Sequence, residues 1–167
     1  MESENSILAR LKNKIPQSVV EVSEFRGELT VVVKREHIVP VCAFLRDDPE
    51  LSFDFLSDLT AVDRLGRKPR FDVVYHSYSI SRNHRIRLKV GVDEDQSVES
   101  VTSVWSGANW FEREVFDMFG INFENHPDLK RILMPDDWEG HPLRKDFPLT
   151  REEVMFTHNK NRPPKIE

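Results

Sequence analysis

Apolar positions in the first half of the chain alternate between helical and strand spacing. Residues 6–14 and 35–46 carry apolar side chains three or four positions apart, which predicts two helices. Residues 29–34 are rich in β-branched side chains and predict a strand. Residues 53–62 are mostly apolar, and their pattern fits a strand or a helix equally well.

The clearest predicted strands are residues 71–80 and 85–92. In the second segment, apolar side chains alternate with basic ones from Arg85 to Val90, which is typical of a strand with one buried and one solvated face. The short polar stretch at residues 81–84 predicts a tight turn between them. We therefore expect an antiparallel hairpin.

Two further helices are predicted at residues 97–105 and 109–119. Asn109 suits the N-cap of the second helix, and Glu112 follows it at the spacing of a capping box. Gly120 suits a left-handed residue that ends the helix.

After Gly120 no periodicity persists, and prolines become frequent. Apolar side chains recur among these prolines and many charges, so the segment neither matches one regular element nor suits full solvation. We call residues 120–167 the strap and expect it to complete its burial on another surface. The predicted fold is α+β: a body at residues 1–119, in two layers with helices packed on a mixed, largely antiparallel sheet, followed by the extended, proline-punctuated strap.

The composition of the chain argues against several classes of function. A net charge of −5 argues against nucleic-acid binding, because phosphate contacts need a concentrated basic surface. No segment approaches the roughly 20 apolar residues of a membrane span, and the acidic start lacks the apolar region of a signal peptide. We therefore expect a cytoplasmic protein. The single cysteine, Cys42, excludes a disulfide or an iron–sulfur cluster held by this chain alone, and we expect it to be buried.

Motifs for nucleotide chemistry and nucleophilic catalysis are missing from the sequence. The six glycines are scattered singly, so no dinucleotide-binding turn or phosphate-binding loop is formed. No GxSxG motif is present either. Phe44 and Phe55 are interpreted as core residues.

Carboxylates and histidines are dense from Glu112 to Asp146. A metal-dependent enzyme using Glu112, Glu114, His126 and His141 is a remote possibility, because the two histidines lack paired spacing. Ion pairing and capping are favoured instead, with Arg113 reaching Asp117 four positions on. Both histidines precede prolines, and we interpret them as structural hydrogen-bonding groups rather than as a proton relay.

Residues 110–148 resemble the 30-kDa subunit of proton-pumping NADH:quinone oxidoreductase, respiratory complex I. The matching motifs are Glu112-Arg113-Glu114, Asp117-Met118-Phe119-Gly120, Lys130-Arg131-Ile132-Leu133 and residues 135–148. The resemblance implies a non-catalytic subunit of the peripheral arm, on the cytoplasmic face of a bacterial membrane, which supports electron transfer from NADH to quinone coupled to proton translocation. Its membrane association would be indirect, through the complex.

The resemblance also implies partners and cofactors. The main partner would be the 49-kDa subunit, with other subunits of the peripheral arm. FMN and iron–sulfur clusters would lie in partner subunits, and none would be bound by this chain. An equivalent subunit of a membrane-bound [NiFe] hydrogenase, or of a ferredoxin- or F420-linked oxidoreductase, is the alternative. The predicted signature and interface residues are Trp110, Glu112, Arg113, Glu114, Asp117, His126, Lys130, Arg131, Trp138, His141, Arg144 and Phe147.

Overall fold

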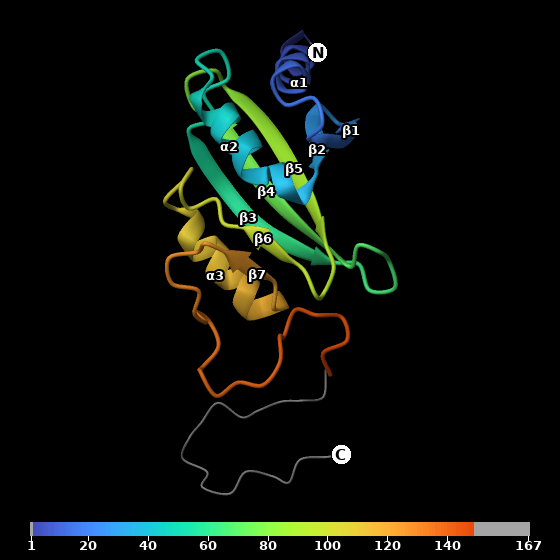
Figure 1. The fold of residues 1–167 in the computed structure, drawn as a ribbon, viewed down its shortest axis with the longest axis vertical. Helices are drawn as coiled ribbons and strands as arrows, with labels where there is room; N and C mark the ends of the chain where they lie inside the picture. Colours follow the sequence, from blue (N-terminus) through green and yellow to red (C-terminus); the bar gives the residue numbers. More distant parts are fainter. Residues whose placement is uncertain (1, 149–167) are drawn as a thin grey trace, which may run out of the picture.

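A five-stranded mixed sheet forms the centre of the body (Figure 1). The computed structural model describes residues 2–148, and the side chains from residue 6 onward. The strand order is β1-β2-β5-β4-β3; β2 and β5 run parallel, and the other neighbours are antiparallel. The strands are β1 Val19–Phe25, β2 Glu28–Val33, β3 Phe55–Asp63, β4 Phe71–Ser79 and β5 His84–Val92.

Three helices contribute to one hydrophobic core with this sheet. They are α1 Glu2–Lys14, α2 Ile38–Asp47 and α3 Ala108–Phe119, and a short 3-10 turn, η1 Arg35–His37, leads into α2. The core joins apolar side chains of all three helices to those of β2 to β5. Helix α3 packs along β3. The predicted α+β class, with helices on a mixed and largely antiparallel sheet, is confirmed.

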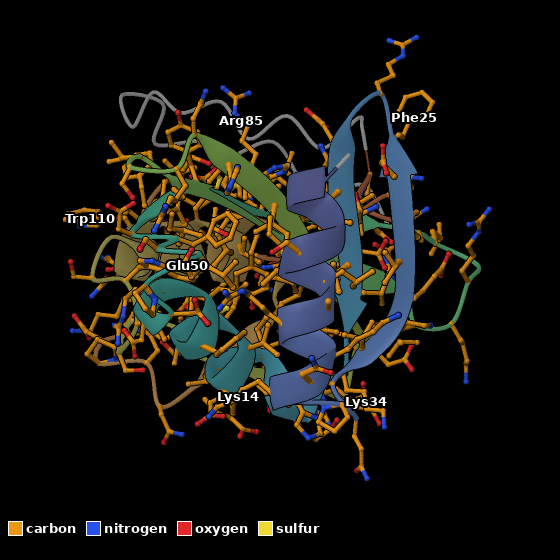
Figure 2. All side chains as sticks on the ribbon, turned by 90° about the horizontal axis from the view of Figure 1, so that it is seen from above. Lys14, Phe25, Lys34, Glu50, Arg85 and Trp110 are labelled. Atoms are coloured by element: carbon orange, nitrogen blue, oxygen red, sulfur yellow. The ribbon has the colours of Figure 1, made fainter. Side chains whose placement is uncertain are left out.

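The β4–β5 hairpin is confirmed, and its two faces differ as the sequence predicts. Ile86 and Leu88 are buried on the inner face, since alternate side chains of a strand point to opposite sides. Arg85 and Arg87 lie on the outer face, and Figure 2 shows Arg85 projecting away from α1 and α2.

The predicted helix at residues 97–105 is wrong. Ser97–Glu99 forms strand β6, which pairs in parallel with strand β7, Asn122–Glu124, at the start of the strap. The amides that a helix would use internally bond elsewhere: Ser100 N–H donates to a carbonyl of β7, and Val101 N–H donates to a carboxylate of α3. These tertiary hydrogen bonds override the local helical spacing.

Three other expectations are changed by the structure. The ambiguous segment 53–62 is strand β3, and Phe55 at its start is half exposed rather than a core residue. Strand β1 was not predicted, and most of its side chains are exposed. The predicted helix at residues 35–46 is divided between η1 and α2. Cys42 on α2 is buried, as expected.

The ends of α3 match the sequence only in part. Gly120 has φ of 74° and ends the helix in the left-handed conformation, as predicted. The helix begins one residue before Asn109, and Gly107 occupies the cap position without a side-chain hydrogen bond. The predicted Asn109–Glu112 capping box is therefore wrong. No helix in the described part of the chain is long and apolar enough to cross a bilayer.

Candidate functional site

Helix α3 divides the predicted site residues between its buried and exposed sides. Glu112 and Asp117 have no exposed surface, whereas Trp110 is 63% exposed and Glu114 is exposed as well. Figure 1 shows the strap, in orange, continuing from β7 past α3. The contacts between α3 and the strap define the site.

Arg113 connects the outer side of α3 to the main chain of the strap. Its Nε donates to the carbonyl of Lys130 at 3.0 Å, and its Nη2 donates to that of Arg131 at 3.0 Å. Its guanidinium also lies 5.6 Å from the ring centre of Trp110, at cation–π distance. The predicted pairing of Arg113 with Asp117 is wrong, because Arg113 binds strap carbonyls instead.

Asp117 organises the next part of the strap. Its Oδ2 accepts the amides of Ile132, Leu133 and Met134 at 3.0, 2.8 and 2.8 Å. Its Oδ1 accepts Arg131 Nη1 at 2.9 Å. Burial acts to raise the pKa of Asp117, but these amide donors and the Arg131 charge together hold that pKa below its ordinary value. Asp117 is therefore a buried anion satisfied within its own chain.

The strap also caps the C-terminal end of α3, where helix carbonyls lack intrahelical partners. His141 Nδ1 donates to the carbonyl of Asp117 at 2.9 Å, and Leu143 N–H donates to that of Met118 at 3.1 Å. Arg144 Nε donates to the carbonyl of Phe119. Burial lowers the pKa of His141 below its usual value, which favours the neutral ring, and the capping contact places the proton of that ring on Nδ1.

Glu112 faces the core instead of the strap. Its carboxylate accepts Ser100 Oγ at 2.7 Å and Val101 N–H at 2.8 Å. Burial raises the pKa of Glu112 to about 7, and these two hydrogen bonds oppose that rise. His126 Nε2 lies 3.9 Å away and contacts the Asn109 carbonyl at 3.2 Å.

His126 has a defined tautomer in this arrangement. Its Nδ1 accepts the amide of Asp128 at 3.1 Å, so the proton of a neutral ring resides on Nε2 and points at the Asn109 carbonyl. Both predicted histidines therefore hydrogen-bond the backbone, in agreement with the structural interpretation. Lys130, also in the predicted set, is exposed and pairs with Asp128 at 2.9 Å.

Trp138 and Phe147 close the strap on itself. Their ring centroids are 6.4 Å apart with an interplanar angle of 21°. Gly140 lies close by, and a Cβ there would stand 3.0 Å from the Phe147 ring. Arg131 Nη2 donates to the Gly140 carbonyl at 3.1 Å. The described strap thus has a compact internal structure despite its lack of periodicity.

Arg70 and its partners were missed by sequence reasoning. Arg70 joins Asp63 and Glu94 of the body to Asp146 of the strap. These residues come from separate turns and strand ends, where no repeat or motif connects them. Asp146 alone carried a signal, as part of the family motif.

Of the four residues considered for a metal site, His126 and Glu112 approach each other at 3.9 Å, but the four do not converge on one point. Glu112 is buried and Glu114 is exposed on another side of α3, while His141 donates to a helix carbonyl. Among residues 2–148 no group of three or more His, Cys, Asp or Glu side chains is placed to bind one ion. The geometry instead describes adhesion between a helix and an extended segment.

Comparison with known proteins identifies the family of this chain. Residues 31–153 match the family described as the respiratory-chain NADH dehydrogenase 30-kDa subunit. The chain belongs to this family. A relative from Roseiflexus sp. (strain RS-1), named as a subunit of NADH-quinone oxidoreductase, is 60% identical over 94% of this chain and 91% of the relative. A second relative, from Geobacter sulfurreducens and with the same name, is 54% identical over 89% of this chain and 92% of the relative.

The 30-kDa subunit fold also occurs in a more distant solved structure. A chain of the membrane-bound sulfane sulfur reductase, described as an archaeal respiratory membrane complex, superposes with a TM-score of 0.73. The match covers 97% of this chain and 99% of the other, at 22% identity. At that identity the likeness shows a shared fold alone.

Proposed function

We propose that this chain is a non-catalytic subunit of an NADH–quinone oxidoreductase and supports assembly of its peripheral arm. The observation that carries the proposal is the 60% identity, over 94% of the chain, to a protein named as a subunit of that enzyme. The complex would work at the cytoplasmic face of a bacterial membrane, coupling electron transfer from NADH to quinone with proton translocation. This chain would be held there by its partners.

The redox groups would belong to other subunits. Cys42, the one cysteine, is fully buried, and burial raises the pKa of its thiol. A buried neutral thiol is a poor metal ligand, since the thiolate is the form that binds. The state of Cys42 supports placing the iron–sulfur clusters in partner subunits, and the family resemblance implies the same place for FMN.

The surface that we propose for the 49-kDa partner is the outer side of α3 together with the strap. It exposes large apolar side chains: Trp110 at 63%, Leu133 at 56% and Leu143 at 54%. Exposed apolar groups on a rigid frame are typical of protein interfaces, and tryptophan is enriched among their strongest contacts. Arg113 and Asp117 fix the strap main chain behind these side chains.

The choice of complex can be tested by purification through an affinity tag on this chain in its native host. We expect the purified assembly to oxidise NADH with quinone as acceptor and to contain a 49-kDa subunit without nickel-binding cysteine pairs. Hydrogen- or F420-dependent activity in the same preparation, with NADH oxidation absent, would assign the chain to the hydrogenase-type alternative.

The docking surface can be tested with Trp110→Glu. A charge at the centre of an apolar interface is costly, so we expect affinity for the 49-kDa subunit to fall by about tenfold or more. The measurement is a binding titration between the full-length chain and the purified 49-kDa subunit.

Phe25→Glu is the matched control, because Phe25 is 69% exposed and also lies beneath an arginine, Arg26. Figure 2 shows Trp110 and Phe25 at opposite sides of the molecule. We expect the control to bind normally. Equal binding by both variants, or loss in the control alone, would move the interface away from α3.

A further inference from the structure

Arg70 lies where the strap returns to the body. Its side chain is 8% exposed and faces three carboxylates. Nε and Nη2 contact Asp63 at 3.1 and 2.9 Å, Nη1 contacts Glu94, and Nη2 also contacts Asp146 at 2.9 Å. Asp63 ends β3 and Glu94 follows β5, whereas Asp146 belongs to the strap.

The residues beside Asp146 reinforce this connection. The amide of Lys145 donates to Asp63 Oδ2 at 2.8 Å, so the same carboxylate holds Arg70 and the strap main chain. The guanidinium of Arg144 lies 5.3 Å from the ring centre of Phe71, and that of Arg70 lies 4.9 Å from it. The strap is thus fastened by charge and by hydrogen bonds at one place.

The two sides of this cluster differ in burial, which makes it releasable. Asp63 is 2% exposed in its side chain, whereas Asp146 is 49% exposed. When Asp146 departs, Arg70 keeps Asp63 and Glu94, so no buried charge is left unpaired. Losing all partners of a buried ion is very costly, but losing one of three is modest. The body can therefore stay folded while the part of the strap around Asp146 detaches.

We propose that Arg70 is a latch that holds residues 143–147 on the body, so that the strap's outer side chains are in place before the partner docks. This inference rests on the proposed function, since it assigns a purpose to the latch in docking. Ordering a segment before binding removes part of the entropic cost of association, and apparent affinity is proportional to the fraction of molecules in the binding-competent, latched state.

The latch itself is tested on the isolated full-length chain with Asp146→Asn. We expect amide hydrogen exchange in the peptide spanning residues 141–147 to quicken by about three- to tenfold, because loss of a charge-assisted hydrogen bond raises the open population. Exchange in β4 and β5 should not change. Asp136→Asn, at an exposed carboxylate of the same segment, is the control and should exchange like the parent; Asp146→Glu should restore most of the protection.

Unchanged exchange in Asp146→Asn, or equal effects in both Asn variants, would overturn the latch. Its role in docking is tested by titrating the same variants with the 49-kDa subunit, where the affinity of Asp146→Asn should fall by the factor by which its latched fraction falls. Weakening by Trp110→Glu but not by Asp146→Asn would leave the docking surface intact and refute the latch's role. If neither variant weakens binding, the docking surface itself is wrong.

Discussion

Glu112 and Asp117 are buried carboxylates on one helix whose environments move their pKa values in opposite directions. Asp117 accepts three strap amides and a guanidinium, which together outweigh the effect of burial on its pKa. Glu112 accepts one hydroxyl and one amide, and burial prevails. The number and charge of the donors, rather than depth alone, decide which carboxylate stays ionised.

The raised pKa of Glu112 predicts a pH-dependent stability. The folded pKa of about 7 exceeds the ordinary 4.5, so the unfolded chain releases this proton first as pH rises. The contribution of Glu112 to the free energy of unfolding, on the order of 3 kcal/mol, is fully present below about pH 4.5 and is lost as pH rises to about 7. Urea unfolding from pH 5 to pH 8 should show the parent losing stability relative to Glu112→Gln. Parallel curves for the two proteins would contradict the shifted pKa.

At the scale of elements, the end of α3 depends on one residue without a side chain. Gly120 has φ of 74°, and a Cβ there would stand 2.5 Å from His141 Nε2 and 2.9 Å from Arg144 Nη2. The helix stop and the strap contact therefore need the same glycine. This position joins backbone conformation to tertiary packing.

Gly120→Ala should therefore destabilise the protein by more than the strain of a left-handed alanine alone. A left-handed alanine costs about 1–2 kcal/mol, and displacement of His141 and Arg144 should bring the loss in unfolding free energy to about 2–4 kcal/mol. Gly27→Ala is the control. Gly27 has φ of 76° and open space where a Cβ would be added, so this variant should lose only the stability that the left-handed backbone conformation of alanine costs. Urea denaturation of both variants measures the difference. Similar losses would mean that His141 and Arg144 yield easily.

Elements with their own periodicity could be predicted from the sequence, and elements held by distant contacts could not. The β4–β5 hairpin carries its alternation locally, and Gly120 carries its stop signal in its residue type. Residues 97–105 have helical spacing, but Glu112 and β7 take the amides that a helix would need. Strand β1 is an edge strand with mostly exposed side chains, so it shows little hydrophobic pattern.

The candidate site was predicted in its residues but only partly in its contacts. The motif from Glu112 to Phe147 contains the groups that join α3 to the strap. Spacing on a helix suggested that Arg113 pairs with Asp117, yet both side chains bind main-chain groups of the strap. Such contacts have no signal in residue type, because every residue offers a carbonyl and every residue except proline offers an amide.

At the scale of the whole molecule, the body and the described strap are joined through ionised carboxylates. Hydrogen bonds from Arg70 lower the pKa of Asp63 and of Asp146 below their ordinary values. The pKa of Asp117 is lowered as well. These groups stand at two of the places where the described strap meets the body, so acid should act on these contacts before it acts on the sheet.

The lowered pKa values determine in which direction stability changes with pH. Each carboxyl binds its proton less readily when folded, so its contribution is complete above its ordinary value of 3.8 and is lost as pH falls through the folded pKa. In a titration from pH 6 to pH 2.5, amide NMR signals of Met134 and Lys145 should shift or vanish at higher pH than that of Leu88 in β5. Simultaneous loss of all three signals would show one cooperative acid transition instead.

The manner in which Asp117 holds the strap leaves freedom for evolutionary change. Its carboxylate accepts hydrogen bonds from the main-chain amides of residues 132–134, a group that every amino acid except proline possesses. These amide contacts are consequently independent of the exposed side chain of Leu133, whereas Met134 packs against the core. The side chain at position 133 can therefore be exchanged to follow mutations in a binding partner while the loop keeps its course, so one carboxylate separates the shape of this surface from its chemistry.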